Sequence, residues 1–467
     1  MVRATVERIF APAVILMGRL WYWQKFILII ILFTIPVGYA LFSFIAQIDR
    51  SIAFSEKEIS GLHYLFPVGI LLQDLQQHRD MGSVYLRGDT SFLPLLEEKE
   101  KKIKEDFVLI NAKDQEFGKE LRTTESLNAI QKKWASLEKD YAQLTLKESV
   151  RQHTELISDV FVLIRYIGDI SNLILDPDLD TYYLMNTVVN TLPDLSENLS
   201  QAREFVLSID DPKKIDAAAA AAADRRVIIN YSKIALIADE KIKRDTQVAF
   251  GQTNSLVAVL DNPLKDMSVS VRNFASLLDT FVNTNKVEMP LLEYYTVSTA
   301  VIDKNFSLLD SLSWSLHDLL HHRVERFQSD KRIIIEITIL SYILILYFFI
   351  GFYILVARTV RNLENIAKQL ISGRVAEVTV LSNDELGEVG ESFNAIGKEL
   401  IGSNNEILRK VQEVQKKSEE LEHLNKFMIN REVRMSELKD EIAKLKSISS
   451  PDPEQGEQLD GHGRMKS

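Results

Sequence analysis

The sequence contains no cysteine. This absence excludes disulfide bonds, thiolate zinc sites and cysteine nucleophiles, and it leaves open whether the folded parts face an oxidising or a reducing compartment. The chain also lacks the excess of basic residues that a nucleic-acid partner requires, because its formal net charge is -11. We therefore expect no nucleic-acid partner.

The alternation of apolar and polar residues that is typical of β-strands is not sustained in residues 49–332. Apolar residues instead recur at steps of three and four, which places them on one face of a helix. The length of 467 residues suits two or three domains. The sequence therefore predicts an all-α fold, and the best single example of the helical pattern is Leu127, Ile130, Trp134, Leu137, Tyr141 and Leu144.

Two uncharged apolar runs occupy residues 26–48 and 337–357. Each is long enough to cross a hydrocarbon core of about 30 Å as a helix. The first run is longer than the apolar region of a signal peptide and does not lead into a small-residue cleavage site. We predict two transmembrane helices, at 26–48 and 333–357, and a lipid bilayer as partner.

Basic residues precede the first apolar run and follow the second, which favours a cytoplasmic location for both flanks. Four basic residues just before the second run oppose this orientation, but long domains are translocated largely regardless of charge. The expected localisation is the bacterial inner (cytoplasmic) membrane, with two spans and a periplasmic sensor domain. The expected boundaries are a cytoplasmic segment 1–25, helix 26–48, a periplasmic helical domain 49–332, helix 333–357, a converter 358–405, a coiled coil 406–446 and a disordered tail 447–467.

Turn-forming residues divide the predicted periplasmic domain into long helices, packed as one bundle or as two stacked bundles. The alanine run 217–223 is expected to be helical, with a close helix contact as the alternative. The expected breaks are Gly88-Asp89-Thr90-Ser91 with Pro94, Asp210-Asp211-Pro212, Asp261-Asn262-Pro263 and Pro290.

A first candidate ligand site lies between Gln73 and Asp89, where Arg79 and Arg87 are about two helical turns apart and Tyr85 lies between them. Guanidinium groups facing a bundle interior match the geometry of carboxylates and oxyanions. The alternative is that both arginines pair with acidic side chains of the protein. The predicted ligand is an unidentified small periplasmic molecule.

A second candidate contains Asp176, Asp180, Tyr182 and Tyr183. The aspartate spacing lacks the glycine and distal glutamate of an EF-hand loop, so a turn and helix start, capped by Asp176 or Asp178, is favoured over calcium. His317 and His321 share a helix face without the glutamate of a zinc protease motif, which favours a surface pair. We predict no metal site, no cofactor and no catalytic residues.

Two short amphipathic helices follow the second apolar run, one over 360–370 and one over 386–400. A connector over 372–383 separates them, and an apolar repeat continues from Ile407 to Leu445. Because two such helices cannot enclose a core alone, we expect a homodimer that forms a four-helix bundle followed by a parallel coiled coil.

Residues 358–400 resemble a HAMP domain, the linker of bacterial receptors and sensor kinases. The resemblance is carried by Thr359-Val360-Arg361-Asn362-Leu363, Ser372-Gly373-Arg374, Asp384-Glu385-Leu386-Gly387-Glu388-Val389 and Phe393-Asn394, with Thr359 where the family usually has proline. The resemblance implies a signal-converting role for Val360, Leu363, Leu370, Gly373, Asp384, Glu385, Leu386, Gly387, Phe393 and Asn394.

The N-terminal half resembles the input half of methyl-accepting chemotaxis receptors and sensor histidine kinases, through the segments Glu58 to Tyr64, Gln73 to Asp89 and Leu175 to Met185. No methyl-accepting tip, kinase histidine helix or nucleotide-binding box follows Lys446. The expectation is a non-enzymatic receptor for a separate cytoplasmic kinase or response regulator. The alternatives are a truncated or split histidine kinase or chemotaxis receptor, and a structural membrane scaffold.

Overall fold

A computed structural model describes residues 2–209, 218–284, 291–371 and 385–446. Within these ranges the chain consists of helices and short turns, and it contains no strand. The predicted all-α fold class is therefore confirmed. Two of the expected helix breaks, at Asp210-Asp211-Pro212 and at Pro290, lie outside the described residues, as do the connector 372–383 and the tail 447–467.

The chain forms two compact units, one from Phe33–Ile339 and one from Met1–Leu32 with Leu340–Ser467. We call the described residues of the first unit the helical domain. Helices α2 (Tyr22–Leu86) and α10 (Leu291–Ile371) contribute residues to both units without interruption.

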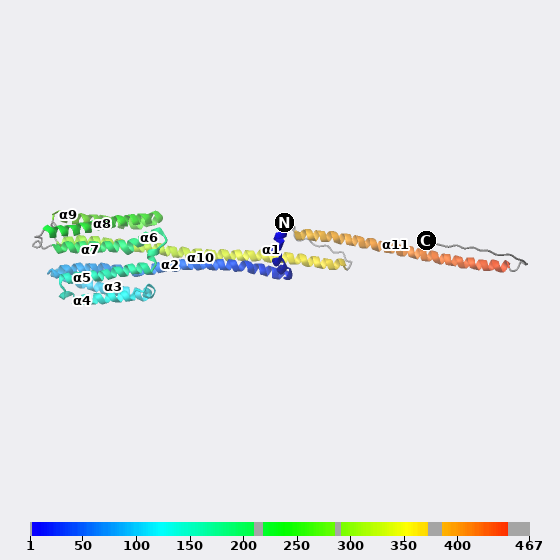
Figure 1. Cartoon of the computed structure of the whole chain (residues 1–467), viewed down its shortest axis with the longest axis horizontal. Helices are drawn as coiled ribbons and strands as arrows, with labels where there is room; N and C mark the ends of the chain where they lie inside the picture. The colour runs from blue at the N-terminus through cyan, green and yellow to red at the C-terminus, as the bar shows by residue number, and fades with distance from the viewer. Residues whose placement is uncertain (1, 210–217, 285–290, 372–384, 447–467) are drawn as a thin grey trace. The chain divides into compact units, whose positions relative to one another are not determined.

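The helical domain contains two neighbouring sets of helices (Figure 1). In the first set, α2 packs with α3, α4 and α5, and in the second set, α10 packs with α7, α8 and α9. Buried apolar side chains of both sets belong to one continuous core, so the sets form a single folded body. The bounds are α3 (Leu93–Leu121), α4 (Thr124–Asp140), α5 (Leu146–Ile170), α6 (Leu179–Asn186), α7 (Leu192–Ile209), α8 (Ala218–Gln252) and α9 (Ser255–Thr284).

The predicted break after α2 is confirmed. Gly88 has a φ of 107°, a left-handed conformation that glycine adopts without strain. The Asp89 carboxylate accepts a hydrogen bond from the Ser91 backbone N–H, and Pro94 lies in the first turn of α3. Local chemistry therefore sets this turn, and the predicted apolar face of α4 is buried as expected at Leu127, Ile130, Trp134 and Leu137.

The predicted break at Asp261-Asn262-Pro263 is wrong, because α9 continues through Pro263. Proline removes one helical hydrogen bond and costs about 3 kcal/mol in a helix interior. Leu260 and Leu264 on either side are buried in the core, and this packing keeps the segment helical. The chain turns earlier, where the Thr253 backbone N–H still bonds to Ala249 and α9 begins at Ser255.

One irregular turn joins α6 to α7 inside an otherwise continuous helical rod. Residues Thr187–Thr191 form a π-helix, in which the chain is wound more widely than in an α-helix. Thr187, Val188, Val189 and Thr191 are buried there. This turn was not predicted from the sequence, because its β-branched residues lower helix propensity without indicating a wider winding.

Two helices in the described part of the chain, Tyr22–Leu86 and Glu293–Gln369, are long and apolar enough to cross a membrane. Their most apolar windows are not covered by protein, as expected for surfaces that face lipid. The Phe26 ring lies 5.2 Å from Phe349 and 5.5 Å from Tyr353, so the two apolar segments pack together. The structure therefore supports membrane association.

The remaining helices differ from the expectation in where they begin and end. Residues 360–370 are the end of α10 and not a separate helix, because no break follows the apolar segment. Helix α11 (Glu385–Lys446) is also continuous, and α1 (Val2–Arg19) was not predicted. Apolar side chains along α11, such as Ile407, Leu421 and Met435, are exposed in the single chain.

Candidate functional site: two buried arginine clusters

The first buried cluster, which we call the Arg79 cluster, contains Arg79 and Asp80 of α2 and Glu197, Ser200 and Arg203 of α7. The Arg79 guanidinium grips the Glu197 carboxylate with two hydrogen bonds, of 2.7 and 3.2 Å. It also donates to the Ser200 hydroxyl at 2.9 Å. The side chains of Arg79 and Arg203 are at most 1% exposed, so the cluster holds two cations inside the core.

The Asp80 carboxylate neutralises the charge of the second buried cation, Arg203. Its carboxylate accepts a hydrogen bond from Arg203 Nε at 2.9 Å, a closer one from the same guanidinium and one from Ser200 Oγ at 2.7 Å. Arg203 also donates to Thr299 Oγ1 of α10 at 2.7 Å and lies over the Tyr295 ring. The cluster therefore joins α2, α7 and α10.

The ionisation of these groups follows from their surroundings. Burial opposes the charge on Arg79, but the neighbouring carboxylates of Glu197 and Asp80 outweigh it and raise the pKa of the guanidinium. Burial and the charge on Asp80 raise the pKa of Glu204, on α7 beside this cluster, to about 7. The arginines thus remain charged, while one acid at the edge titrates near neutral pH.

The predicted anion-binding residues Arg79, Tyr85 and Arg87 have protein partners. Arg79 binds Glu197, and Arg87 donates to Glu204 Oε1 at 3.1 Å and to the Leu207 carbonyl oxygen. Tyr85 stacks on Tyr141 with ring centres 6.3 Å apart. The pairing with acidic side chains, given above as the alternative, is the arrangement in the structure, and a ligand would have to displace these carboxylates.

The second cluster, which we call the Arg323 cluster, was missed by the sequence analysis. Arg323 of α10 donates to Glu58 of α2 at 3.2 Å, to Asp176 at 2.9 Å and to Thr181 Oγ1 of α6 at 2.6 Å. Its Nε also lies 2.9 Å from the Asp178 carboxylate. The cluster ties together α2, α10 and the turn before α6.

The Arg323 cluster contains more acid than base. Burial, followed by the charge on Asp176, raises the pKa of Glu58 to about 8, and the attraction of Arg323 does not cancel this. A protonated Glu58 carboxyl group can donate a hydrogen bond to Asp176, and one oxygen of each is otherwise buried without a partner among the described residues. Glu58 is therefore protonated at neutral pH, and the cluster gains or loses a proton in a physiological range.

Close backbone packing supports this cluster. Gly61, one turn after Glu58 on α2, lies against Ser171 at the end of α5, and a Cβ at position 61 would lie 2.3 Å from the Ser171 Cβ. Glycine is needed here for the approach of two backbones, not for an unusual φ. The same approach brings the Asp176 turn within reach of α2.

The predicted aspartates and tyrosines make contacts within the protein: the aspartates accept hydrogen bonds, and the tyrosines pack against each other. Asp176 caps the turn by accepting from the Asp178 backbone N–H at 2.9 Å, in addition to binding Arg323. Asp180 accepts from the Thr181 N–H and from Thr253 Oγ1 at 2.6 Å. Tyr182 and Tyr183 pack edge to face, 5.4 Å apart. In the described ranges no three acidic or histidine side chains form a metal-binding group.

The histidine pair near the end of the domain contacts α2. His317 stacks on His63 with ring centres 4.9 Å apart and lies 6.1 Å from His321. Burial lowers the pKa of both His63 and His317, which favours neutral imidazoles. His321 is exposed, as a surface pair predicts, but His317 also lines an apolar groove of about 340 Å³ with Phe66 and Trp314.

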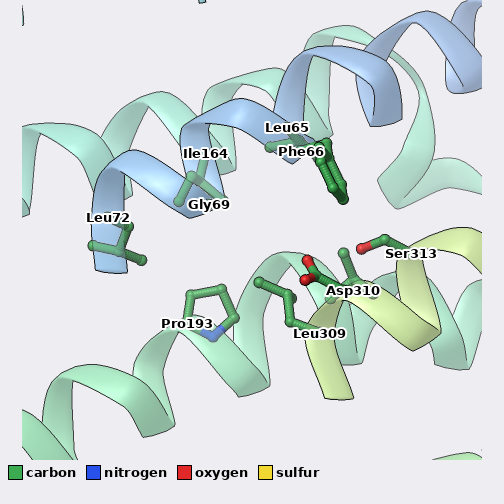
Figure 2. Close-up of a pocket in the computed structure, with 10 residues that line it drawn as sticks. Leu65, Phe66, Gly69, Leu72, Ile164, Pro193, Leu309, Asp310 and Ser313 are labelled. Carbon is green, nitrogen blue, oxygen red and sulfur yellow. The ribbon is translucent and has the colours of Figure 1, made fainter. Parts of the chain in front are cut away.

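A narrow crevice separates α2 from α10 between the two clusters (Figure 2). Leu65, Phe66 and Leu72 line it from α2, and Leu309 and Asp310 line it from α10. Burial raises the pKa of the Asp310 carboxyl group. The two helices that carry the apolar segments are therefore incompletely packed against each other here.

The residues that resemble HAMP positions lie at the end of α10 and the start of α11. Val360 and Leu363 are half-buried, and Leu370 belongs to the last turn of α10. Gly373 and Asp384 lie outside the described residues. Glu385, Leu386, Gly387, Phe393 and Asn394 form the first turns of α11, where Glu385 is exposed and Gly387 is buried.

Comparison with known protein families, curated proteins and solved structures finds no match for this chain. Its function must therefore be inferred from its own geometry. Both clusters tie three elements of the helical domain together, and each includes residues or contacts of α2 and α10.

Proposed function

We propose that this protein is an inner-membrane sensory receptor that passes a periplasmic stimulus through a HAMP-type segment and a coiled coil to a separate cytoplasmic kinase or response regulator. One observation carries the proposal: α10 is a single helix from Leu291 to Ile371. This helix carries Thr299, which contacts the Arg79 cluster, and Arg323. It also carries the second apolar segment and the first residues that resemble HAMP.

The mechanism uses α10 as the moving part. A ligand that binds one arrangement of the helical domain more tightly shifts the population towards that arrangement. Because Arg323 and Thr299 fix α10 to α2 and α7, the rearrangement displaces α10 along or about its axis. A few kcal/mol of differential binding suffices to move such an equilibrium across its midpoint.

A homodimer supports the output half of the proposal. The apolar side chains of α11 recur at helical spacing, yet they are exposed in the single chain. A second copy packed in parallel would cover them, as in a coiled coil. Partner docking on this coiled coil supplies the output, and no catalytic residue is assigned.

The absence of cysteine provides a direct test. Ile407→Cys introduces a single thiol into α11 of the full-length protein, so disulfide formation between two copies reports the packing of that helix. Arg323→Gln, which removes the ion pairs of the Arg323 cluster, should change the crosslinking yield. Arg332→Gln, an exposed position on the same helix, is the matched control and should not change it. Equal yields in all three proteins would contradict the proposal.

Insertion of one residue after Ala357 separates a receptor from a passive scaffold. One residue rotates the following helix by about 100°. The converter proposal predicts that crosslinking at position 407 changes with each successive insertion, and a scaffold predicts no dependence on register.

The ligand class is tested by thermal-shift screening of the full-length protein against oxyanions, organic acids and amines. A compound of any of these classes that binds the folded domain should raise the unfolding temperature. Absence of a shift with every class would count against direct sensing of small molecules.

A further inference from the structure

A pocket of about 490 Å³ opens beside the Arg323 cluster, between α2 and α10. Its apolar wall is formed by Phe54, Leu175, Pro177 and Phe327. Its charged residues are Arg50, Arg323 and Arg326, against the single acid Asp178. The pocket therefore combines an apolar wall with a net positive charge.

The arginines of the pocket differ in their partners. Arg323 is compensated by Asp176 and Asp178. Arg50 and Arg326 have no ion-pair or hydrogen-bond partner among the described residues, and both are exposed. Two guanidinium groups thus line one pocket without a carboxylate to neutralise them.

The position of the pocket indicates what it binds. Arg50 follows the first apolar run, which ends at residue 48, by two residues, and Arg326 precedes the predicted second span, which starts at residue 333, by seven residues. At 1.5 Å per residue these arginines lie about 3 and about 11 Å along their helices from the ends of the predicted membrane spans. The headgroup layer extends about 5–8 Å beyond each side of the hydrocarbon core, so Arg50 lies within it and Arg326 lies close to its outer edge.

We propose that Arg50 and Arg326 bind a phosphate group in this pocket, carried by an anionic lipid headgroup or supplied as a free anion. Guanidinium groups match phosphate oxygens with paired hydrogen bonds. The apolar wall suits the glycerol and upper acyl chain of a lipid, which favours the lipid as the source. The proposal rests only on the membrane placement within the proposed function and not on signalling.

The bound phosphate also acts on the Arg323 cluster. Asp178 and Arg323 line the same pocket, and their contact involves Arg323 Nε, with Asp178 about half exposed at 48%. A phosphate next to this pair competes with Asp178 for Arg323. Occupancy of the pocket therefore weakens one of the contacts that fix α10 to the turn before α6.

The ordinary alternative is that Arg50 and Arg326 are interfacial anchors whose charged ends reach to the headgroup region without a defined site. Arg332 provides the matched comparison, because it is an exposed arginine next to the same apolar segment that does not line the pocket. An anchor role predicts that all three arginines behave alike. A built site predicts that Arg332 differs.

The experiment uses the full-length protein in nanodiscs of phosphatidylcholine, alone or mixed with phosphatidylglycerol. Native mass spectrometry after release measures retained phosphatidylglycerol, and unfolding temperature in phosphatidylcholine nanodiscs with inorganic phosphate measures the free anion. Each arginine lost should weaken binding on the order of tenfold, as expected for a charge-assisted hydrogen-bonding group.

The outcomes separate the sources. Loss of retained phosphatidylglycerol in the Arg50→Gln/Arg326→Gln variant, but not in Arg332→Gln, supports a lipid site. A phosphate-induced stabilisation lost in the same double variant supports a free-anion site. Equal lipid retention and equal response to phosphate in all proteins would overturn the proposal, while leaving the crosslinking test of the receptor function unaffected.

Discussion

The Arg79 cluster, which joins α2, α7 and α10, and the Arg323 cluster, which joins α2, α10 and the turn before α6, balance charge differently. In the Arg79 cluster, two guanidinium groups meet Asp80 and Glu197, with hydroxyl groups filling the remaining positions. In the Arg323 cluster, one guanidinium meets three acids, and Glu58 keeps its proton to about pH 8. In the first cluster the buried charges are paired and only Glu204 at its edge titrates near neutral pH, whereas in the second cluster a central acid, Glu58, titrates.

Under the proposed receptor function, this difference gives the two clusters different roles. A fully compensated buried junction is costly to break and holds one packing arrangement. A cluster with unpartnered oxygens and a titrating acid has alternatives of similar energy, which a switch needs. Four measurements test whether the two clusters differ in this way.

The largest effect is expected for Asp80→Ala. This substitution leaves Arg203 buried without its carboxylate, and loss of one partner from a buried ion pair costs about 3–5 kcal/mol. Thermal and denaturant unfolding of the full-length protein measure the loss. The double variant Asp80→Leu/Arg203→Met should recover much of it, and a cost below about 1 kcal/mol for Asp80→Ala would refute the pairing of these buried charges.

Arg323→Gln should cost less, about 2–3 kcal/mol at neutral pH, because Glu58 is already uncharged there and Asp176 is the main buried charge left unpaired. The same unfolding measurements apply. A loss equal to that of Asp80→Ala would show that the two clusters do not differ in the way described.

Glu58→Gln should flatten the pH dependence of stability. The folded state raises the pKa of Glu58 from 4.5 to about 8, so the folded chain holds a proton that the unfolded chain releases. Its contribution is complete below pH 4.5 and is lost as the pH rises through 8. Unfolding temperature measured across this range should fall less steeply in the variant. Parallel curves for both proteins would contradict the assignment.

Two other groups limit how flat the curve becomes. The pKa values of Asp106 and Glu204 are also raised, each to about 7, first by burial and then by a neighbouring aspartate. Their contributions are lost in the same direction as the pH rises. The Glu58→Gln curve should therefore keep a slope close to neutral pH and lose most of the change above it.

The smallest effect is expected at an exposed pair that resembles the clusters only in composition. Arg165 and Asp194 are 2.7 Å apart, but each is 51% exposed. Arg165→Gln should change stability by about 0–0.5 kcal/mol, since water solvates both charges. A loss above about 1 kcal/mol would show that burial is not what distinguishes the clusters.

Local features of the fold were predictable from the sequence. Apolar spacing predicted the buried face of α4, and Gly88, Asp89 and Pro94 predicted the turn before α3. These signals act within a few residues of one another. Pro263 failed as a signal because its neighbours pack in the core, and packing with distant residues is not visible in a local pattern.

The Arg323 cluster could not be predicted because its members are far apart in sequence. Glu58 and Arg323 are separated by 265 positions, and only the folded chain brings them to 3.2 Å. A usable signal was present: Leu312, Leu316 and Leu320 form a buried stripe on α10 that Arg323 continues. A charged residue at a core position of an apolar stripe predicts a buried pair, although it does not identify the partner.

The π-helix between α6 and α7 determines how far α7, which contributes to the Arg79 cluster, is rotated relative to α6, which contributes to the Arg323 cluster. Thr181 of α6 binds Arg323, and Glu197 and Arg203 of α7 belong to the Arg79 cluster, so one rod reaches both. Winding Thr187–Thr191 as an ordinary α-helix, with no residue removed, would rotate α7 by about 100° relative to α6, because the wide turn holds one residue more than an α-helical turn. The acids and bases of α7 would then point away from α2 while α6 kept its place. The wide turn therefore sets the rotation of α7 relative to α6, so that side chains on different faces of one continuous helical rod reach the two clusters.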